Sequence, residues 1–189
     1  MNSRWALSAL PLALGIIACG GLPGLAPTPT SSSAPEPSPA GTPVQSPSPS
    51  DTPTLVSITV YFTDSARYAV GTPPFEGAVT RHIVPGSDLP AAVLDEFFRG
   101  PTPEEQALGL ERITSGFTGY SLLRIENGIA HLYLVGPCAS NGATYTIAQP
   151  ILASLLPLPE IDYVKIYDQE GTTENPEGRS NSIPVCLEP

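Results

Sequence analysis

The side chains of this chain that could do chemistry are few: three cysteines, two histidines and two adjacent acidic pairs in its second half. Cys138 and Cys186 lie far from each other and have no CxxC or HxxxH spacing with His82 or His131, as a zinc site would require. The GxSxG turn of serine hydrolases and a Gly-rich phosphate loop are also missing. The sequence therefore predicts no catalytic residue, no metal site and no cofactor site, and we expect the protein not to be an enzyme.

The acidic pairs Asp95-Glu96 and Glu104-Glu105 are the strongest candidates for acid–base catalysis. Glycoside hydrolysis needs two carboxyl groups about 5–10 Å apart across a cleft, and adjacency in sequence does not supply that arrangement. Both pairs fall in predicted helices, where adjacent acids usually form solvated faces or caps. An acid–base hydrolase is therefore the weakest of three hypotheses, and it would require an activity that is lost when these acids are changed.

The N-terminal segment suggests covalent modification, rather than catalysis, at Cys19. Arg4 precedes an apolar run from Trp5 to Ile17, which is too short for a bilayer span of about 20 residues but suits the apolar part of an export signal. The segment Ile16-Ile17-Ala18-Cys19 resembles the processing box of bacterial lipoproteins. That resemblance implies a signal peptide over residues 1–18, lipidation of Cys19 and an extracytoplasmic protein attached to the bacterial membrane. An ordinary cleaved signal with a chance cysteine is the alternative.

Residues 19–54 follow as the lipidated cysteine and a stretch rich in Pro, Ser and Thr, with no aromatic residue. Such a composition cannot build a core, and its prolines favour extended polyproline II at about 3.1 Å per residue. We interpret the stretch as a stalk that separates a folded domain from the membrane. Ser/Thr-Pro tracts can also carry O-glycans or bind proline-reading domains.

Residues 55–189 are enough for one domain with a real core and too few for two. The formal net charge of the whole chain is −10, and most of its acids lie after Asp51. An acidic surface disfavours nucleic acid and anionic lipid, since both need a basic face. The domain is therefore expected to bind no nucleic acid.

Cys138 and Cys186 remain as an even pair if Cys19 carries lipid. In an oxidising compartment the simplest account of such a pair is a disulfide. The bond would tie the end of the chain to a loop that follows a central strand.

The first half of the domain alternates predicted strands and helices. Val56–Phe62 has the period-two pattern of a half-buried strand, and shorter strands are predicted at Arg67–Val70 and Val79–Val84. Ser87 or Asp88 can cap a helix that Gly100-Pro101 ends. Next, Thr102-Pro103-Glu104-Glu105 has the spacing of a capping box and predicts a second, short helix.

A β-hairpin is predicted where Asn127-Gly128 separates Gly119–Ile125 from Ile129–Val135, because both turn residues tolerate positive φ. Its register sets Ile125 opposite Ala130 and Leu123 opposite Leu132 on the core side, and Arg124 opposite His131 on the other. This makes His131 a surface partner across the strands rather than a catalytic base.

The chain then predicts a helix over Thr144–Leu156, which Pro150 kinks or delays, and a last strand over Ile161–Tyr167. Residues 170–184 form a polar excursion before Cys186. The fold class is α/β (α+β): a single small domain with a mixed or antiparallel sheet and helices packed on it.

The order of several segments resembles the GerMN domain, a domain of bacterial lipoproteins and of spore-germination proteins. The resemblance covers about Ser57–Asp168 and departs from the family in Pro150, in the cysteine pair and in having one copy of the domain. Its carriers are the strands Ile58–Phe62 and Val79–Pro85, the corner Phe97–Glu105, the hairpin Glu126–Ala130, and Gln149 followed by Val164-Lys165-Ile166. It implies a small α/β domain similar to the ring-building modules of secretion and sporulation assemblies, without known catalysis.

Two hypotheses from different classes follow. The first is a non-catalytic, lipid-anchored module of the cell envelope that binds an envelope protein or copies of itself, in assembly, sporulation or germination. The alternative is an accessory lipoprotein that binds the cell wall or carbohydrate, because Tyr120, Tyr133 and Tyr145 could stack on sugars. Tyrosines in strands more often pack on the sheet.

Overall fold

The computed structural model describes residues 54–189. The predicted signal peptide, Cys19 and the predicted stalk up to residue 53 lie outside the described residues. No helix within residues 54–189 combines the length and the apolar character needed to cross a membrane.

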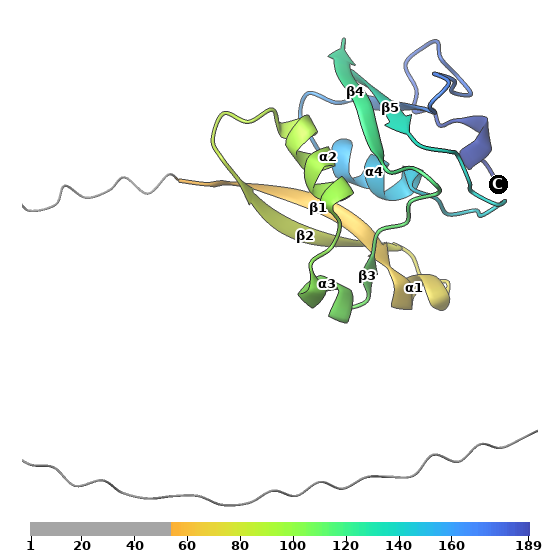
Figure 1. The fold of residues 1–189 in the computed structure, drawn as a ribbon. Coiled ribbons are helices and arrows are strands. Elements are labelled where there is room, and N and C mark those ends of the chain that lie inside the picture. The colour runs from red at the N-terminus through yellow and green to blue at the C-terminus, as the bar shows by residue number, and fades with distance from the viewer. Residues whose placement is uncertain (1–53) are drawn as a thin grey trace, which may run out of the picture. The chain divides into compact units, whose positions relative to one another are not determined.

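Strands β1 (Val56–Asp64), β2 (Glu76–Ile83) and β3 (Leu110–Glu111) form an antiparallel sheet in the order β2-β1-β3. β1 and β2 form a long pair whose far end joins Val56 to Ile83 (Figure 1). Successive side chains of β1 point to opposite faces of the sheet. Ile58, Val60 and Phe62 are buried, and the residues between them are more exposed.

A second sheet has the order β4-β5-β6 and contains β4 (Gly119–Glu126), β5 (Ile129–Val135) and β6 (Tyr163–Tyr167). β4 and β5 are antiparallel, whereas β5 and β6 are parallel. The hairpin register is confirmed, with Ile125 opposite Ala130 and Arg124 opposite His131. Asn127 and Gly128 both have positive φ, as the predicted turn requires.

Helices α2 (Leu89–Arg99) and α4 (Ala148–Leu155) pack on β1 and on each other. In Figure 1 they lie between the β1–β2 pair and the β4–β5 pair. Val93, Leu94 and Phe97 of α2 are fully buried, and Phe97 stacks on Phe62 with 5.8 Å between ring centroids. These contacts join both sheets and both helices in one hydrophobic core, so the predicted α+β class is confirmed.

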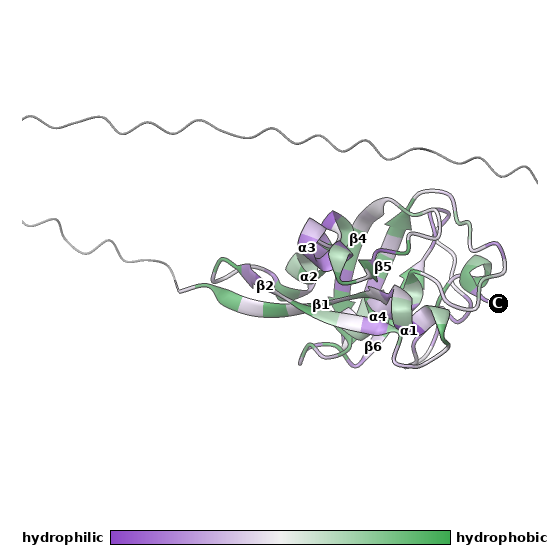
Figure 2. Cartoon of the chain, turned by 90° about the horizontal axis from the view of Figure 1, so that it is seen from below, coloured by the Kyte–Doolittle hydropathy of each residue, from purple (hydrophilic) through white to green (hydrophobic). Residues whose placement is uncertain are grey.

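The short helices α1 (Ser65–Ala69) and α3 (Pro103–Ala107) lie close to β3 at the other end of β1. The residues of α3 are mainly hydrophilic, whereas those at the start of β1 are mainly hydrophobic (Figure 2). α3 is the short helix that the capping box predicts, and both reciprocal hydrogen bonds between Thr102 and Glu105 are present.

Several predicted elements differ from the structure. The strand predicted at Arg67–Val70 is wrong, because the side chain of Asp64 accepts a hydrogen bond from the amide of Arg67 and caps helix α1 there. α4 begins at Ala148 rather than at Thr144, so Pro150 lies in the first turn, where its missing N–H is not needed. The strands also divide into two sheets, and β3 was not predicted.

The end of the chain packs against β6. The amide of Ile166 donates to the carbonyl of Ser182, and the amide of Ser182 donates to the carbonyl of Val164. Lys165 is 1% exposed, and its Nζ donates to the carbonyls of Asn175 and Glu177 at 2.5 and 3.2 Å. The 3-10 helix η1 (Val185–Leu187) then buries Leu187 in the core.

Candidate functional site at the corner between α2 and α3

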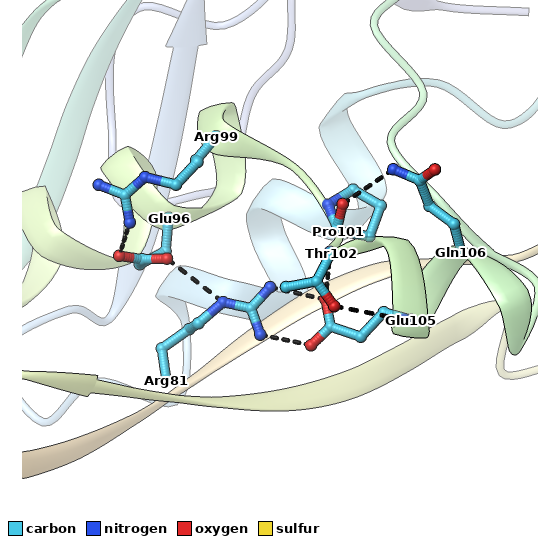
Figure 3. Close-up of polar contacts among 7 residues, drawn as sticks. All are labelled: Arg81, Glu96, Arg99, Pro101, Thr102, Glu105 and Gln106. Carbon is cyan, nitrogen blue, oxygen red and sulfur yellow. Dashed lines mark hydrogen bonds and ion pairs between the residues drawn. The ribbon is translucent and has the colours of Figure 1, made fainter. Parts of the chain in front are cut away.

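Arg81 organises the corner between α2 and α3. It lies on β2, and its guanidinium bridges two carboxylates: Nε is 3.2 Å from Glu96 of α2, while both terminal nitrogens bond Glu105 of α3. Figure 3 shows Arg81 between these two acids. The three side chains are only 13–17% exposed. One arginine thus fixes both helices to the sheet.

The ion pairs also set the protonation of the corner. The hydrogen bond from Arg81 keeps the pKa of Glu105 below its ordinary value, and the same bond raises the pKa of Arg81. Glu105 additionally accepts a hydrogen bond from the amide of Thr102 at 2.8 Å. It is therefore held as a carboxylate, and it is unsuited to donate a proton as a general acid near neutral pH.

The backbone between the helices is fixed by Gly100 and by hydrogen bonds. Gly100 has a φ of 88° and a ψ of 177°, a conformation essentially reserved for glycine, and its amide donates to the carbonyls of Glu96 and Phe97. The side chain of Gln106 donates to the carbonyl of Pro101 at 2.9 Å (Figure 3). The corner is therefore a fixed backbone feature with bonds on both sides.

A pocket of about 480 Å³ opens at this corner. The C-terminal end of α2, the corner itself, α3 and β3 each contribute to its wall. The lining residues are Arg99, Gly100, Pro101, Gln106, Leu110, Glu111 and Arg112. Its volume falls within the range of about 300–1,000 Å³ that is usual for small-molecule sites.

Arg112 is the unusual member of this wall. Its Nη1 is buried and has no hydrogen-bond partner among the described residues. The guanidinium carbon lies 6.0 Å from the centroid of the Phe98 ring, a cation–π distance. An alanine Cβ at position 100 would lie 3.8 Å from Nε of Arg112, so the side chain runs close to the corner backbone.

Each of the other arginines that the structure describes forms an ion pair with a carboxylate. In contrast, Arg112 forms no ion pair within residues 54–189, although the chain is strongly acidic. The pairs are Arg67–Asp64, Arg81–Glu96 and Arg81–Glu105, Arg99–Glu96, Arg124–Glu126 and Arg179–Asp162. The pocket is therefore lined by an arginine that has no carboxylate partner among the described residues and one buried nitrogen without a hydrogen bond. The sequence did not predict a role for Arg112, because this residue differs from the other arginines only in having no ion pair among the described residues.

The acidic pairs considered for catalysis are partly brought together here. Glu96 and Glu105 meet on Arg81, Asp95 accepts a hydrogen bond from the Tyr120 hydroxyl at 2.8 Å, and Glu104 is exposed. Three of the four acids are thus held by neighbouring side chains. Within the part of the chain that the structure describes, no cluster of three His, Cys, Asp or Glu side chains has the geometry to hold a metal.

His131, Tyr120 and Tyr133 lie on the strands of the second sheet, whereas Tyr145 lies in the loop before α4. His131 shares a hydrogen bond of 3.0 Å with the hydroxyl of Tyr167, and burial lowers its pKa. It is half-buried, so the prediction of a surface position is only partly right, although its position opposite Arg124 is correct. Tyr145 is 5% exposed and donates to Glu76, and Tyr133 stacks on Tyr167 at 4.4 Å. Burial and the bond to Asp95 raise the pKa of Tyr120 to about 12.

Cys138 and Cys186 form a disulfide with a Cα–Cα distance of 6.2 Å and a sequence separation of 48 residues. The bond attaches η1 to the loop after β5. Cys19, the predicted lipidation site, lies outside the described residues.

No protein-family model and no curated protein matches the chain. Among solved structures, the chain is similar to the tandem GerMN domains of the sporulation protein GerM from Bacillus subtilis, with 17% sequence identity and a TM-score of 0.44. The alignment covers 77% of this chain and 50% of that chain, so this protein spans half the length of that structure.

Proposed function

We propose that the protein is a non-catalytic, lipid-anchored interaction module of the bacterial cell envelope, built on a GerMN-type domain. In this proposal Cys19 carries the lipid, the Pro/Ser/Thr-rich segment is a spacer, and the folded domain binds an envelope protein or another copy of itself. The sequence features at the N-terminus and the order of segments that resembles GerMN domains support it. A role in an envelope assembly, such as those of sporulation or germination, is part of the proposal.

The observation that carries the proposal is the pocket at the α2–α3 corner with its unpaired Arg112. A buried N–H of a guanidinium without a hydrogen-bond partner is costly within a folded chain, and an ion pair between that guanidinium and another molecule offsets the cost. The wall is also rigid, because Gly100, the capping box and the Arg81 ion pairs fix it. A preformed wall suits binding, because little ordering is required when a partner docks.

The position of the acids favours binding over catalysis. Glu96 and Glu105 both contact Arg81, so both carboxylates are engaged in ion pairs. A pair of acids facing each other across an open cleft would have supported hydrolysis instead. The alternative, binding to the cell wall or to carbohydrate, depends on accessible tyrosines. Tyr145 is buried, and Tyr120 and Tyr133 pack against neighbouring side chains.

In-cell crosslinking of the full-length protein, followed by mass spectrometry, tests the proposal. A Cys19→Ala variant is the control without the lipid. We expect discrete envelope-protein partners or self-crosslinks that are lost or reduced with the control. If no crosslinks form and the protein co-sediments with purified cell wall, the wall-binding alternative is correct and the proposal is wrong.

A further inference from the structure

We propose that the pocket at the α2–α3 corner binds a single carboxylate of a partner protein, either an Asp or Glu side chain or a chain end, and that Arg112 is the residue that pairs with it. This inference rests on the proposed function, since it names the group that the interaction module recognises. Three properties of the pocket lead to it: the state of Arg112, the balance of charge around it and the size of the space.

Arg112 is prepared for an anion. Nη1 is buried and has no hydrogen-bond partner among the described residues, so the cost of burying this one nitrogen is already present in the free protein. The rest of the side chain lines the pocket beside Gly100, which has no side chain to fill the space. A carboxylate that enters the pocket can therefore approach the planar guanidinium, whose fork of N–H donors matches two carboxylate oxygens.

The charge balance of the pocket favours one negative charge rather than two. Arg99 also lines the wall, but its guanidinium is already paired with Glu96. Glu111 adds a carboxylate to the same wall and forms no ion pair within the described residues. A monoanion that pairs with Arg112 therefore meets less repulsion from Glu111 and from the acidic domain than a phosphate dianion would.

The size and lining of the pocket favour a single side chain or chain end of a protein over nucleic acid or anionic lipid. About 480 Å³ accommodates one side chain or a chain end. Leu110 and Pro101 provide apolar surface next to the cation, which suits the methylene or methyl groups that accompany such a carboxylate. Nucleic acid and anionic lipid need a broad basic surface, and a chain with a net charge of −10 does not offer one.

The test is an NMR titration of the full-length protein in detergent at pH 7 and constant ionic strength, with acetate as the probe. We expect acetate to shift the Arg112 Nε–H resonance and the amides of Gly100 and Glu111. Acetamide, which has the same shape without the charge, should leave them unchanged. N-acetylalanine and N-acetylaspartate amide then show whether the pocket prefers a chain end or a side chain, and inorganic phosphate tests the dianion.

The variants separate Arg112 from general electrostatics. Arg112→Gln should weaken acetate binding about tenfold or more, because a charge-assisted bond is lost. Arg124→Gln, which removes an equal charge from the exposed face of β4, should leave binding unchanged. Arg112→Lys keeps the charge but not the fork, and it should bind more weakly than the wild type. It also serves as the second variant if the amide spectrum of Arg112→Gln shows unfolding.

The proposal is overturned if acetate causes no shift, if phosphate binds and acetate does not, or if Arg112→Gln binds acetate as the wild type does. These outcomes are independent of the crosslinking experiment. Crosslinked partners without acetate binding would retain the interaction module and reject the carboxylate pocket. Acetate binding without any crosslinked partner in cells would retain the carboxylate pocket and reject the interaction module.

Discussion

Arg81 and Arg112 are two arginines at the same corner of the fold, and their surroundings differ. Arg81 has two carboxylate partners and connects β2 to α2 and α3. Arg112 has an unpaired, buried nitrogen beside the pocket. We infer that the first arginine maintains the shape of the corner and that the second is available for binding.

Glu105→Gln should lower the free energy of unfolding by about 1–3 kcal/mol at pH 7, because a charge-assisted bond to Arg81 is lost. Chemical denaturation measures the change. Glu104→Gln is the matched control: it is the neighbouring residue, it is exposed, and its substitution should change stability by less than about 0.5 kcal/mol. Equal effects of the two substitutions would contradict the assignment.

The same residue gives the stability a pH dependence. The pKa of Glu105 is lower in the folded protein than its ordinary value of 4.5, so the stabilisation is complete above that value and is lost as the pH falls through the folded pKa. Unfolding measured from pH 6 down to about pH 3 should therefore show a steeper loss for the wild type than for Glu105→Gln. Parallel pH profiles would argue against the ion pair.

Side-chain burial was the part of the site that the sequence could not predict. The capping box of α3 was readable, because Thr102 and Glu105 have the required spacing within one turn. The meeting of Arg81 with Glu96 and Glu105 depends on how β2 packs against two helices, and no local pattern encodes that contact. Lys165 is a similar case, since its strand suggests an exposed position and the end of the chain covers it.

At the scale of elements, turn and cap residues made the structure predictable where the contacts are local. The hairpin register follows from Asn127-Gly128, and the end of α2 follows from Gly100-Pro101. The strand predicted at Arg67–Val70 failed because the cap at Asp64 outweighs a short apolar alternation. The division into two sheets and the parallel pairing of β6 with β5 arise from long-range packing, which local patterns do not report.

Gly128→Ala should destabilise the domain by about 1–3 kcal/mol, because its φ of 79° is unfavourable for alanine and the new Cβ would meet the side chain of Asp162. Gly119→Ala, at the other end of β4, is the control: its backbone has no positive φ and its surroundings are open. Thermal and chemical unfolding of both variants test this. A tolerated Gly128→Ala would contradict the turn geometry.

The disulfide should contribute to stability through the loop that it closes. With a sequence separation of 48 residues between its cysteines, the chain-entropy model gives about 4 kcal/mol. The Cys138→Ser/Cys186→Ser double variant should therefore unfold at a lower denaturant concentration than the oxidised wild type. Reduction of the wild type with dithiothreitol should reproduce the effect. Unchanged stability in both cases would mean that the bond does not constrain the unfolded chain.

At the scale of the whole molecule, the proposal combines a membrane anchor, a spacer and a binding domain. An anchor of two or more acyl chains holds a protein stably at a membrane, because each buried methylene contributes about 0.8 kcal/mol. We therefore expect Cys19→Ala to move the protein from the membrane fraction to the aqueous fraction when cells are fractionated. Retention of the variant in the membrane fraction would contradict lipidation at Cys19.

The central claim, that the α2–α3 corner of a tethered domain binds a partner through Arg112, is tested most directly by site-specific photocrosslinking in cells. A photoreactive residue replaces Gln106, which is exposed and lines the pocket; the control replaces Glu170, which is exposed but does not line it. The account predicts a discrete protein adduct from position 106 that disappears with Arg112→Gln and is absent from position 170. Adducts from position 170 alone, or an adduct at position 106 that persists with Arg112→Gln, would contradict it.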